Sequence, residues 1–101
     1  RSSWQSPAYC SVEMIRAVMG GEAFAWPAGT YVKNEKYQNI MLAMDTTLDT
    51  NGCTYKMPEG TAEEMAALDA SYAHLCKMRD ELVTLNIVPP VEKWNEINPN
   101  L

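Results

Sequence analysis

One segment constrains the fold of this chain more than any other, because both ends of a long helix are marked in it. Thr61 and Glu64 form a capping box, in which each side chain bonds the backbone N–H of the other residue. Asn86 tolerates the left-handed conformation that ends helices, and Pro89-Pro90 prevents continuation. The sequence therefore predicts a helix over 62–85, with apolar residues at near-heptad spacing: Met65, Leu68, Tyr72, Leu75 and Leu82.

Two further helices are predicted in the N-terminal half. The first, over 7–19, begins at Ser6-Pro7, a capping residue followed by the residue best tolerated in a first turn. It carries Tyr9, Val12, Ile15 and Met19, and it ends at Gly20-Gly21. The second helix, over 34–49, has apolar residues at steps of three and four, which place them on one face: Tyr37, Ile40, Met41, Met44 and Leu48.

The remaining segments are expected to be irregular. Residues 26–29 (Trp-Pro-Ala-Gly) are typical of a turn, and 87–101 form an extended, proline-rich C-terminal arm. Residues 54–57 could form a short strand, but the sequence offers it no evident partner. We therefore predict an all-α fold over residues 1–101, a single three-helix domain. Its second and third helices form an antiparallel hairpin, a shorter N-terminal helix crosses them, and both terminal arms are extended.

Composition excludes several classes of function. The 101 residues suit one domain, and the 47% hydrophobic and 21% charged shares are those of a folded protein. Eight basic and thirteen acidic side chains give a net charge of −5, without the basic cluster that nucleic-acid binding requires. The longest apolar run, 40–44, is far shorter than the roughly 20 residues of a transmembrane helix. We expect neither nucleic acid nor a membrane span.

The first residue and the cysteines bear on cellular location. The sequence starts at Arg1 instead of Met, which agrees with a processed organellar or secreted protein but does not identify the compartment. The cysteine count is three, whereas disulfide-framed secreted domains usually carry an even and larger number. We expect three free thiols, with one disulfide and one spare thiol as the alternative.

Metal and cofactor sites are not predicted. His74 and Cys76 lie two residues apart, which on a helix turns their side chains about 200° away from each other. Residues 49–52 (Asp-Thr-Asn-Gly) resemble the middle of a calcium loop, but Thr47 and Pro58 occupy the positions of its two end ligands. We therefore expect no metal and no cofactor.

Catalytic residues are not predicted either, and an enzyme activity of this chain alone is disfavoured. The only histidine is His74, and no nucleophile motif surrounds any serine or cysteine. The adjacent carboxylates Glu63-Glu64 and Asp80-Glu81 suit a helix start and a solvated helix face rather than an opposed acid–base pair.

Aromatic residues outside the predicted helices are the best candidates for contacts with other proteins. Trp4, Trp26 and Trp94 each have a proline within five residues, and rigid segments that present an aromatic side chain often anchor interfaces. In the C-terminal arm, Val91, Trp94 and Ile97 recur at three-residue steps. These five residues are the predicted partner-binding residues. The alternative is that each arm folds back to cover its own core.

These observations favour a non-enzymatic accessory or structural subunit that contacts other protein subunits in a larger assembly, such as an organellar complex or a viral particle. Two alternatives stay open. One is a helical ligand-binding domain whose seven methionines line an apolar pocket. The other is the minor, non-catalytic subunit of an enzyme.

Overall fold

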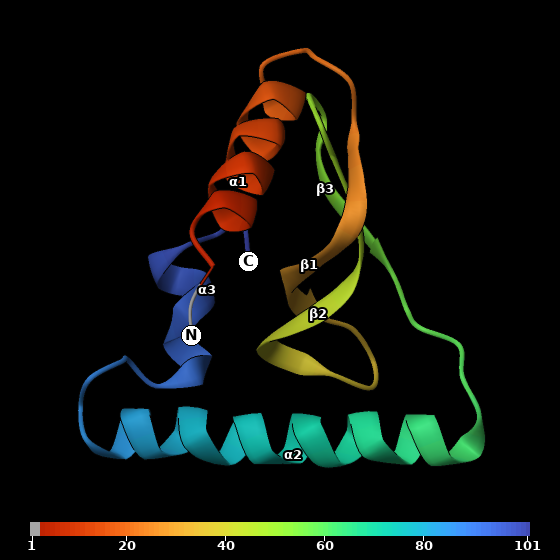
Figure 1. The fold of residues 1–101 in the computed structure, drawn as a ribbon. Coiled ribbons are helices and arrows are strands. Elements are labelled where there is room, and N and C mark those ends of the chain that lie inside the picture. The colour runs from red at the N-terminus through yellow and green to blue at the C-terminus, as the bar shows by residue number, and fades with distance from the viewer. Residues whose placement is uncertain (1–2) are drawn as a thin grey trace. The chain divides into compact units, whose positions relative to one another are not determined.

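The computed structural model describes residues 3–101, which fold into helices and a three-stranded antiparallel sheet (Figure 1). About 44% of the chain is helical and 27% is strand, so the predicted all-α class is wrong and the fold mixes α and β structure. In chain order the elements are α1 (Gln5–Val18), β1 (Phe24–Lys33), β2 (Gln38–Asp49), β3 (Gly52–Lys56), α2 (Ala62–Thr84), the 3-10 helix η1 (Val91–Lys93) and α3 (Trp94–Ile97).

The chain divides into two compact units. The first comprises the residues up to Thr30 together with Ala43–Pro58, and the second comprises Tyr31–Leu42 and Glu59–Leu101. Strands β1 and β2 continue from one unit into the other, so each unit contains part of the sheet. In the first unit the sheet is combined with α1, and in the second with α2, η1 and α3.

The helix predicted over 34–49 is wrong, because residues 38–49 form strand β2, the middle strand of the sheet. Side chains of a strand point alternately to its two faces, and the buried residues of β2 follow that period: Ile40, Leu42, Met44 and Thr46. Met41, which the helical pattern placed on the same face as Ile40 and Met44, is 57% exposed. Ile40 and Met44 fit both the helical period and the two-residue period of a strand. The burial of the β2 side chains follows the strand period.

Strand β3 supplies the partner that the sequence did not reveal for the short strand near residues 54–57. It pairs antiparallel with β2, with Thr47 opposite Thr54 and Asp49 opposite Gly52. The connecting turn is tight, since Gly52 has a φ of +119° and the Asn51 N–H bonds the Asp49 carboxylate at 2.7 Å. A local hairpin therefore joins the two strands.

The turn predicted at 26–29 is also wrong, because these residues lie within β1. Pro27 lacks a backbone N–H and cannot donate a hydrogen bond to a neighbouring strand. It is tolerated here because β1 is an edge strand, which has a neighbouring strand on one side only. Farther along β1, the Thr30 and Thr46 hydroxyls bond each other at 2.5 Å across to β2, which satisfies two buried polar groups.

Both of the other predicted helices exist. Helix α1 begins at Gln5, two residues before its predicted start, and Pro7 still falls in its first turn. It ends as predicted at the glycine pair, where Gly20 has a φ of +99° and the Gly21 N–H bonds the Arg16 carbonyl at 2.9 Å.

The capping box of α2 is confirmed. The Thr61 hydroxyl accepts the Glu64 N–H at 3.2 Å, and the Glu64 carboxylate accepts the Thr61 N–H at 2.8 Å. Asn86 has the expected left-handed φ, +57°, and the Ile87 N–H bonds the Leu82 carbonyl across the end of the helix.

The predicted helical hairpin is replaced by contacts between α2 and the turn that joins β1 to β2. The Tyr37 hydroxyl donates to Asp69 at 2.5 Å, and the Gln38 N–H donates to the Tyr72 hydroxyl at 3.1 Å. The Tyr37 and Tyr72 rings lie 4.8 Å apart at a tilt of 57°, an arrangement that aromatic pairs favour. Tyr37 is only 1% exposed, so this contact anchors the second unit.

Arg79, which interrupts the apolar spacing of α2, belongs to the same contact. Its guanidinium donates to the backbone carbonyls of Gln38 and Asn39 at 3.3 and 3.2 Å and pairs with Asp80 at 2.8 Å. Asn39 has a left-handed φ of +56°, and its side-chain oxygen accepts the Tyr31 hydroxyl proton. The Arg79 guanidinium thus donates charge-assisted hydrogen bonds to backbone carbonyls next to the turn between β1 and β2.

The predicted extended arms are wrong as well. Residues 1–2 of the predicted N-terminal arm lie outside the described residues, and α1 begins directly after Trp4. The C-terminal arm contains η1 and α3. The Trp94 indole N–H donates to the Pro89 carbonyl at 2.8 Å, so the proline pair and the short helix form one folded segment. No helix within residues 3–101 is long and apolar enough to cross a membrane.

The contact between Tyr37 and Asp69 predicts an acid-sensitive second unit. Hydrogen bonds from Tyr37 and then from Lys36 lower the pKa of the Asp69 carboxyl below its ordinary 3.8. A carboxyl whose pKa is lower in the folded state stabilises the fold above its unfolded pKa, and this contribution is lost as the pH falls through the folded pKa. Asp69→Asn should therefore be less stable than the wild type near neutral pH, and the difference should shrink below about pH 4.

Urea unfolding of both proteins at neutral and acidic pH measures this difference. Glu59→Gln, which changes an exposed carboxylate of the same unit, is the matched control and should change stability little at either pH. An Asp69→Asn variant with wild-type stability at neutral pH would contradict the anchoring role of this contact.

Candidate protein-interaction surface

Helix α1 turns one side toward the interior of the first unit. Ala17 is completely buried, and Glu13 and Met14, its neighbours on that side of the helix, are half-buried. The other residues of α1 are exposed. The packed side is therefore narrow, and its only fully buried side chain is small.

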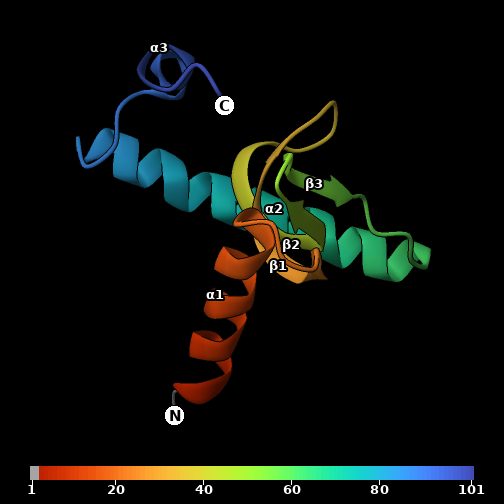
Figure 2. The same ribbon diagram turned by 90° about the horizontal axis from the view of Figure 1, so that it is seen from above.

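The opposite side of α1 carries large apolar side chains. At about 100° per residue, five residues lie about 140–220° around the helix axis from Ala17. They are Trp4, Ala8, Val12, Ile15 and Met19, and we refer to them as the apolar α1 face. The four large ones are between 51 and 83% exposed. Figure 1 and Figure 2 draw α1 as the red-to-orange helix near the N-terminus.

The apolar α1 face is electrically neutral. Glu13 and Arg16 are the charged side chains of α1, and they form an ion pair with each other at 2.7 Å. Fully burying a Val, Ile or Met side chain contributes about 1.5–3 kcal/mol, so covering the four large side chains would contribute on the order of 5 kcal/mol. Water is an unfavourable environment for such a surface, whereas another apolar surface is a favourable one.

A cavity of about 420 Å³ adjoins α1 in the same unit. It is lined from α1, from β1 and from the segment between them, by Tyr9, Cys10, Glu13, Glu22, Ala23, Phe24 and Trp26. Trp26, one of the predicted partner-binding residues, is 69% exposed at this cavity. The first unit thus holds two of the predicted residues, Trp4 on the apolar α1 face and Trp26 at the cavity.

The other three predicted residues lie in the second unit. Val91 and Trp94 are half-buried, whereas Ile97 is 64% exposed. The neighbouring Asn95 accepts a hydrogen bond from the Lys33 ammonium of β1 at 2.9 Å, which ties α3 to the sheet of this unit. Of the three side chains, Ile97 is the one most available to a partner.

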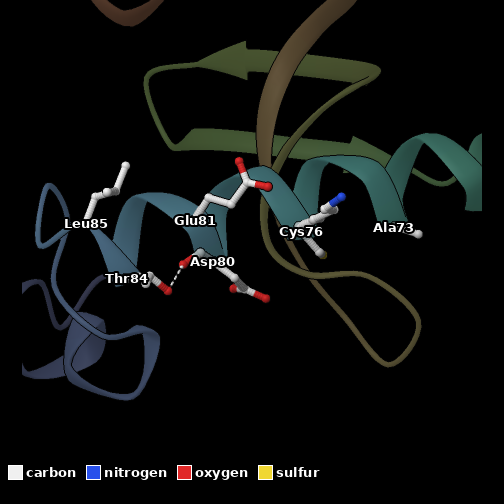
Figure 3. A pocket seen from close by; sticks show the side chains of 7 residues that line it. Ala73, Cys76, Asp80, Glu81, Thr84 and Leu85 are labelled. Atoms are coloured by element: carbon white, nitrogen blue, oxygen red, sulfur yellow. Dashed lines mark hydrogen bonds between the residues drawn. The ribbon is translucent and has the colours of Figure 1, made fainter.

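One side of α2 bears a shallow hollow of about 750 Å³ (Figure 3). Its lining residues all belong to one side of α2 and its end: Ala73, Cys76, Lys77, Asp80, Glu81, Thr84 and Leu85. The hydrogen bond drawn there runs from the Thr84 hydroxyl to the Asp80 backbone carbonyl, a bond within the helix. Because a single helix supplies the lining, the hollow offers no opposed groups for catalysis.

The candidate metal ligands do not converge within residues 3–101, where no three His, Cys, Asp or Glu side chains form a group that could hold an ion. Cys10 lies on α1, Cys53 on β3 and Cys76 on α2, and all three are free thiols. His74 is exposed on α2.

Four residues of the exposed surface, Tyr9, Val12, Ile15 and Met19, were recognised in the sequence as the apolar residues of the first helix, but they were not proposed as partner-binding residues. The periodicity identified side chains that share one side of a helix, but it did not show which side packs. The other side carries Ala17, a small residue that allows a helix to approach a sheet closely, whereas Cys10, seven positions earlier, is exposed.

No protein-family model matches the sequence, and no curated protein is significantly similar to it. The interpretation of the apolar α1 face therefore depends on the chemistry and exposure of its own residues.

The orientation of α1 predicts unequal effects of adding volume to alanine. Ala17→Leu places three more carbon atoms in a completely buried position and should destabilise the protein by about 1–3 kcal/mol. Ala67→Leu makes the same change at an exposed position of α2 and should alter stability by less than about 0.5 kcal/mol. Urea unfolding measures both, and equal tolerance of the two changes would show that α1 does not pack through Ala17.

Proposed function

We propose that this chain is a non-enzymatic accessory subunit that binds other protein subunits in a larger assembly through its apolar α1 face. The supporting observation is the orientation of α1. It packs inward through Ala17 and directs Trp4, Ile15 and Met19, all more than 60% exposed, away from its own unit. A partner that covers these side chains would remove them from water.

The anatomy of the apolar α1 face fits an interface centre. Interface centres are depleted of charge and enriched in aromatic residues and methionine. The face combines Trp4 and Met19 with aliphatic side chains, and the two charges of α1 neutralise each other at its flank. Trp26 at the adjoining cavity is a candidate extension of this contact, and Ile97, with Val91 and Trp94 beside it, is a candidate second contact from the other unit.

The arrangement of the methionines favours surface contacts over a methionine-lined ligand pocket. Met44 is buried in the core, whereas Met19, Met41 and Met78 are about half exposed or more. Within residues 3–101, the cavity beside α1 and the hollow on α2 are lined by no methionine. The minor subunit of an enzyme would use the same kind of contact, so that alternative differs only in the identity of the partner.

Native size fractionation of extracts from the cells of origin tests the proposal. The tagged wild-type chain should migrate in complexes larger than two copies of itself. The double substitution Ile15→Lys with Met19→Lys should shift it to a smaller size, because charged side chains cannot be buried in an apolar contact without a large cost. Migration of the wild-type chain as a monomer or dimer would contradict the proposal.

The matched control adds the same charge elsewhere. Ala66→Lys with Ser71→Lys places two lysines at exposed positions of α2, and this variant should stay in the large complex. If both double variants leave the complex, the effect comes from added charge rather than from the apolar α1 face.

A further inference from the structure

We infer that one partner of the apolar α1 face is the same face of a second copy of this chain, with the two helices antiparallel across a two-fold axis. This inference rests on the proposed function and names one of the subunits that the chain contacts. The argument combines the spacing, the volumes and the charges of the residues on that face.

The spacing is that of a helix pair. Ala8, Val12, Ile15 and Met19 follow one another at steps of four, three and four residues, which is two positions of this face per heptad, and the exposed Tyr9 and Val18 flank them. Steps of four, three and four residues are the spacing of the seam through which one helix meets another. Ala17, which packs inside the unit, lies on the side of the helix away from this seam.

The volumes of the side chains match in the antiparallel arrangement. Ala8 of one copy then faces Met19 of the other, and Val12 faces Ile15. The pair then has four layers of facing side chains. In two layers an alanine faces a methionine, and in the other two a valine faces an isoleucine, so the side chains fill the space evenly. A parallel pair would set Ala8 against Ala8 and Met19 against Met19, leaving a void at one end and crowding at the other.

The charges also permit self-association. Arg16 and Tyr9 flank the seam on the same side, seven residues apart. In the antiparallel pair, Arg16 of each copy lies near Tyr9 of the other, where a guanidinium is attracted to an aromatic ring. Glu13 already neutralises Arg16 within each copy, so no like charges oppose each other at the seam.

The exposed area sets the strength of the contact. The large side chains of the face, Trp4 included, expose on the order of 500 Å² per copy, so complete burial of both faces would remove at most about 1,000 Å² from water. This value is at the low end for specific protein complexes. The dimer should therefore be reversible and dissociate on dilution, unlike an obligate one.

Sedimentation equilibrium of the purified chain over a range of concentrations is the first measurement. The wild type should change from monomer to dimer as the concentration rises through the micromolar range, and Val12→Lys and Ile15→Glu should each be monomeric throughout. Circular dichroism should show that both variants keep their helices, because both positions are exposed. A wild type that stays monomeric up to several hundred micromolar, or a Val12→Lys variant that still dimerises, would overturn the inference.

Mixing the variants tests the antiparallel register. Position 12 faces position 15 of the other copy, so Val12→Lys and Ile15→Glu should form a mixed dimer with a lysine opposite a glutamate. The matched control mixes Val12→Lys with Met19→Glu, which carries the same charges at positions that do not face each other, and this mixture should stay monomeric. Equal association in both mixtures, or in neither, would overturn the antiparallel pairing.

Failure of this inference is distinguishable from failure of the proposed function. A monomeric purified chain that still depends on the apolar α1 face to enter a large complex in cells would show that another protein covers the face. A chain that dimerises when purified but forms nothing larger in cells would support the pairing and contradict the proposed role in a larger assembly.

Discussion

The structure depends on β2, the strand that is hydrogen-bonded at both edges and runs through both compact units. Its alternating buried side chains belong to the core of each unit, and its turn toward β1 carries Tyr37 onto α2. Because the sheet has few strands, it buries few large side chains, and α1 contributes only Ala17 to the fully buried set. The large apolar residues of α1 therefore lie on the outside of the unit. The small hydrophobic core thus leaves these apolar side chains of α1 on the surface, where a partner could cover them.

The parts of the fold that could be predicted from sequence are those that local chemistry determines. The capping box at Thr61, the left-handed Asn86 and the glycine pair after α1 each satisfy backbone groups within a few residues, so their effect is visible without knowledge of distant segments. Strand β2 could not be predicted in this way. Ile40 and Met44 suit a helix as well as a strand, and pairing with β1 and β3 determines the outcome. That pairing also explains why Pro27 lies in a strand instead of a turn.

The candidate interaction surface was predicted only in part, for a related reason. Trp4 was proposed because it lies outside the predicted helices with a proline within five residues, and in the structure it lies on the apolar α1 face. Val12, Ile15 and Met19 were missed because a periodic stripe shows that side chains share one side of a helix without showing whether that side faces the core. Knowing that Ala17 is buried resolves the question. The proposed antiparallel pairing with a second copy uses the volumes of these side chains. The sequence gives the volumes, but only the structure shows that the side chains lie on the free side of the helix.

Oxidation of individual methionines, measured by mass spectrometry in the native assembly and in the dilute isolated chain, tests most directly whether the apolar α1 face is covered by a partner. Met19 is 81% exposed, Met41 is 57% exposed on β2, and Met44 is buried, so each reports on a different environment. In the isolated chain Met19 and Met41 should oxidise readily and Met44 slowly. In the assembly Met19 should become protected while Met41 keeps its rate. Met19 oxidising as fast in the assembly as in the isolated chain would contradict the account.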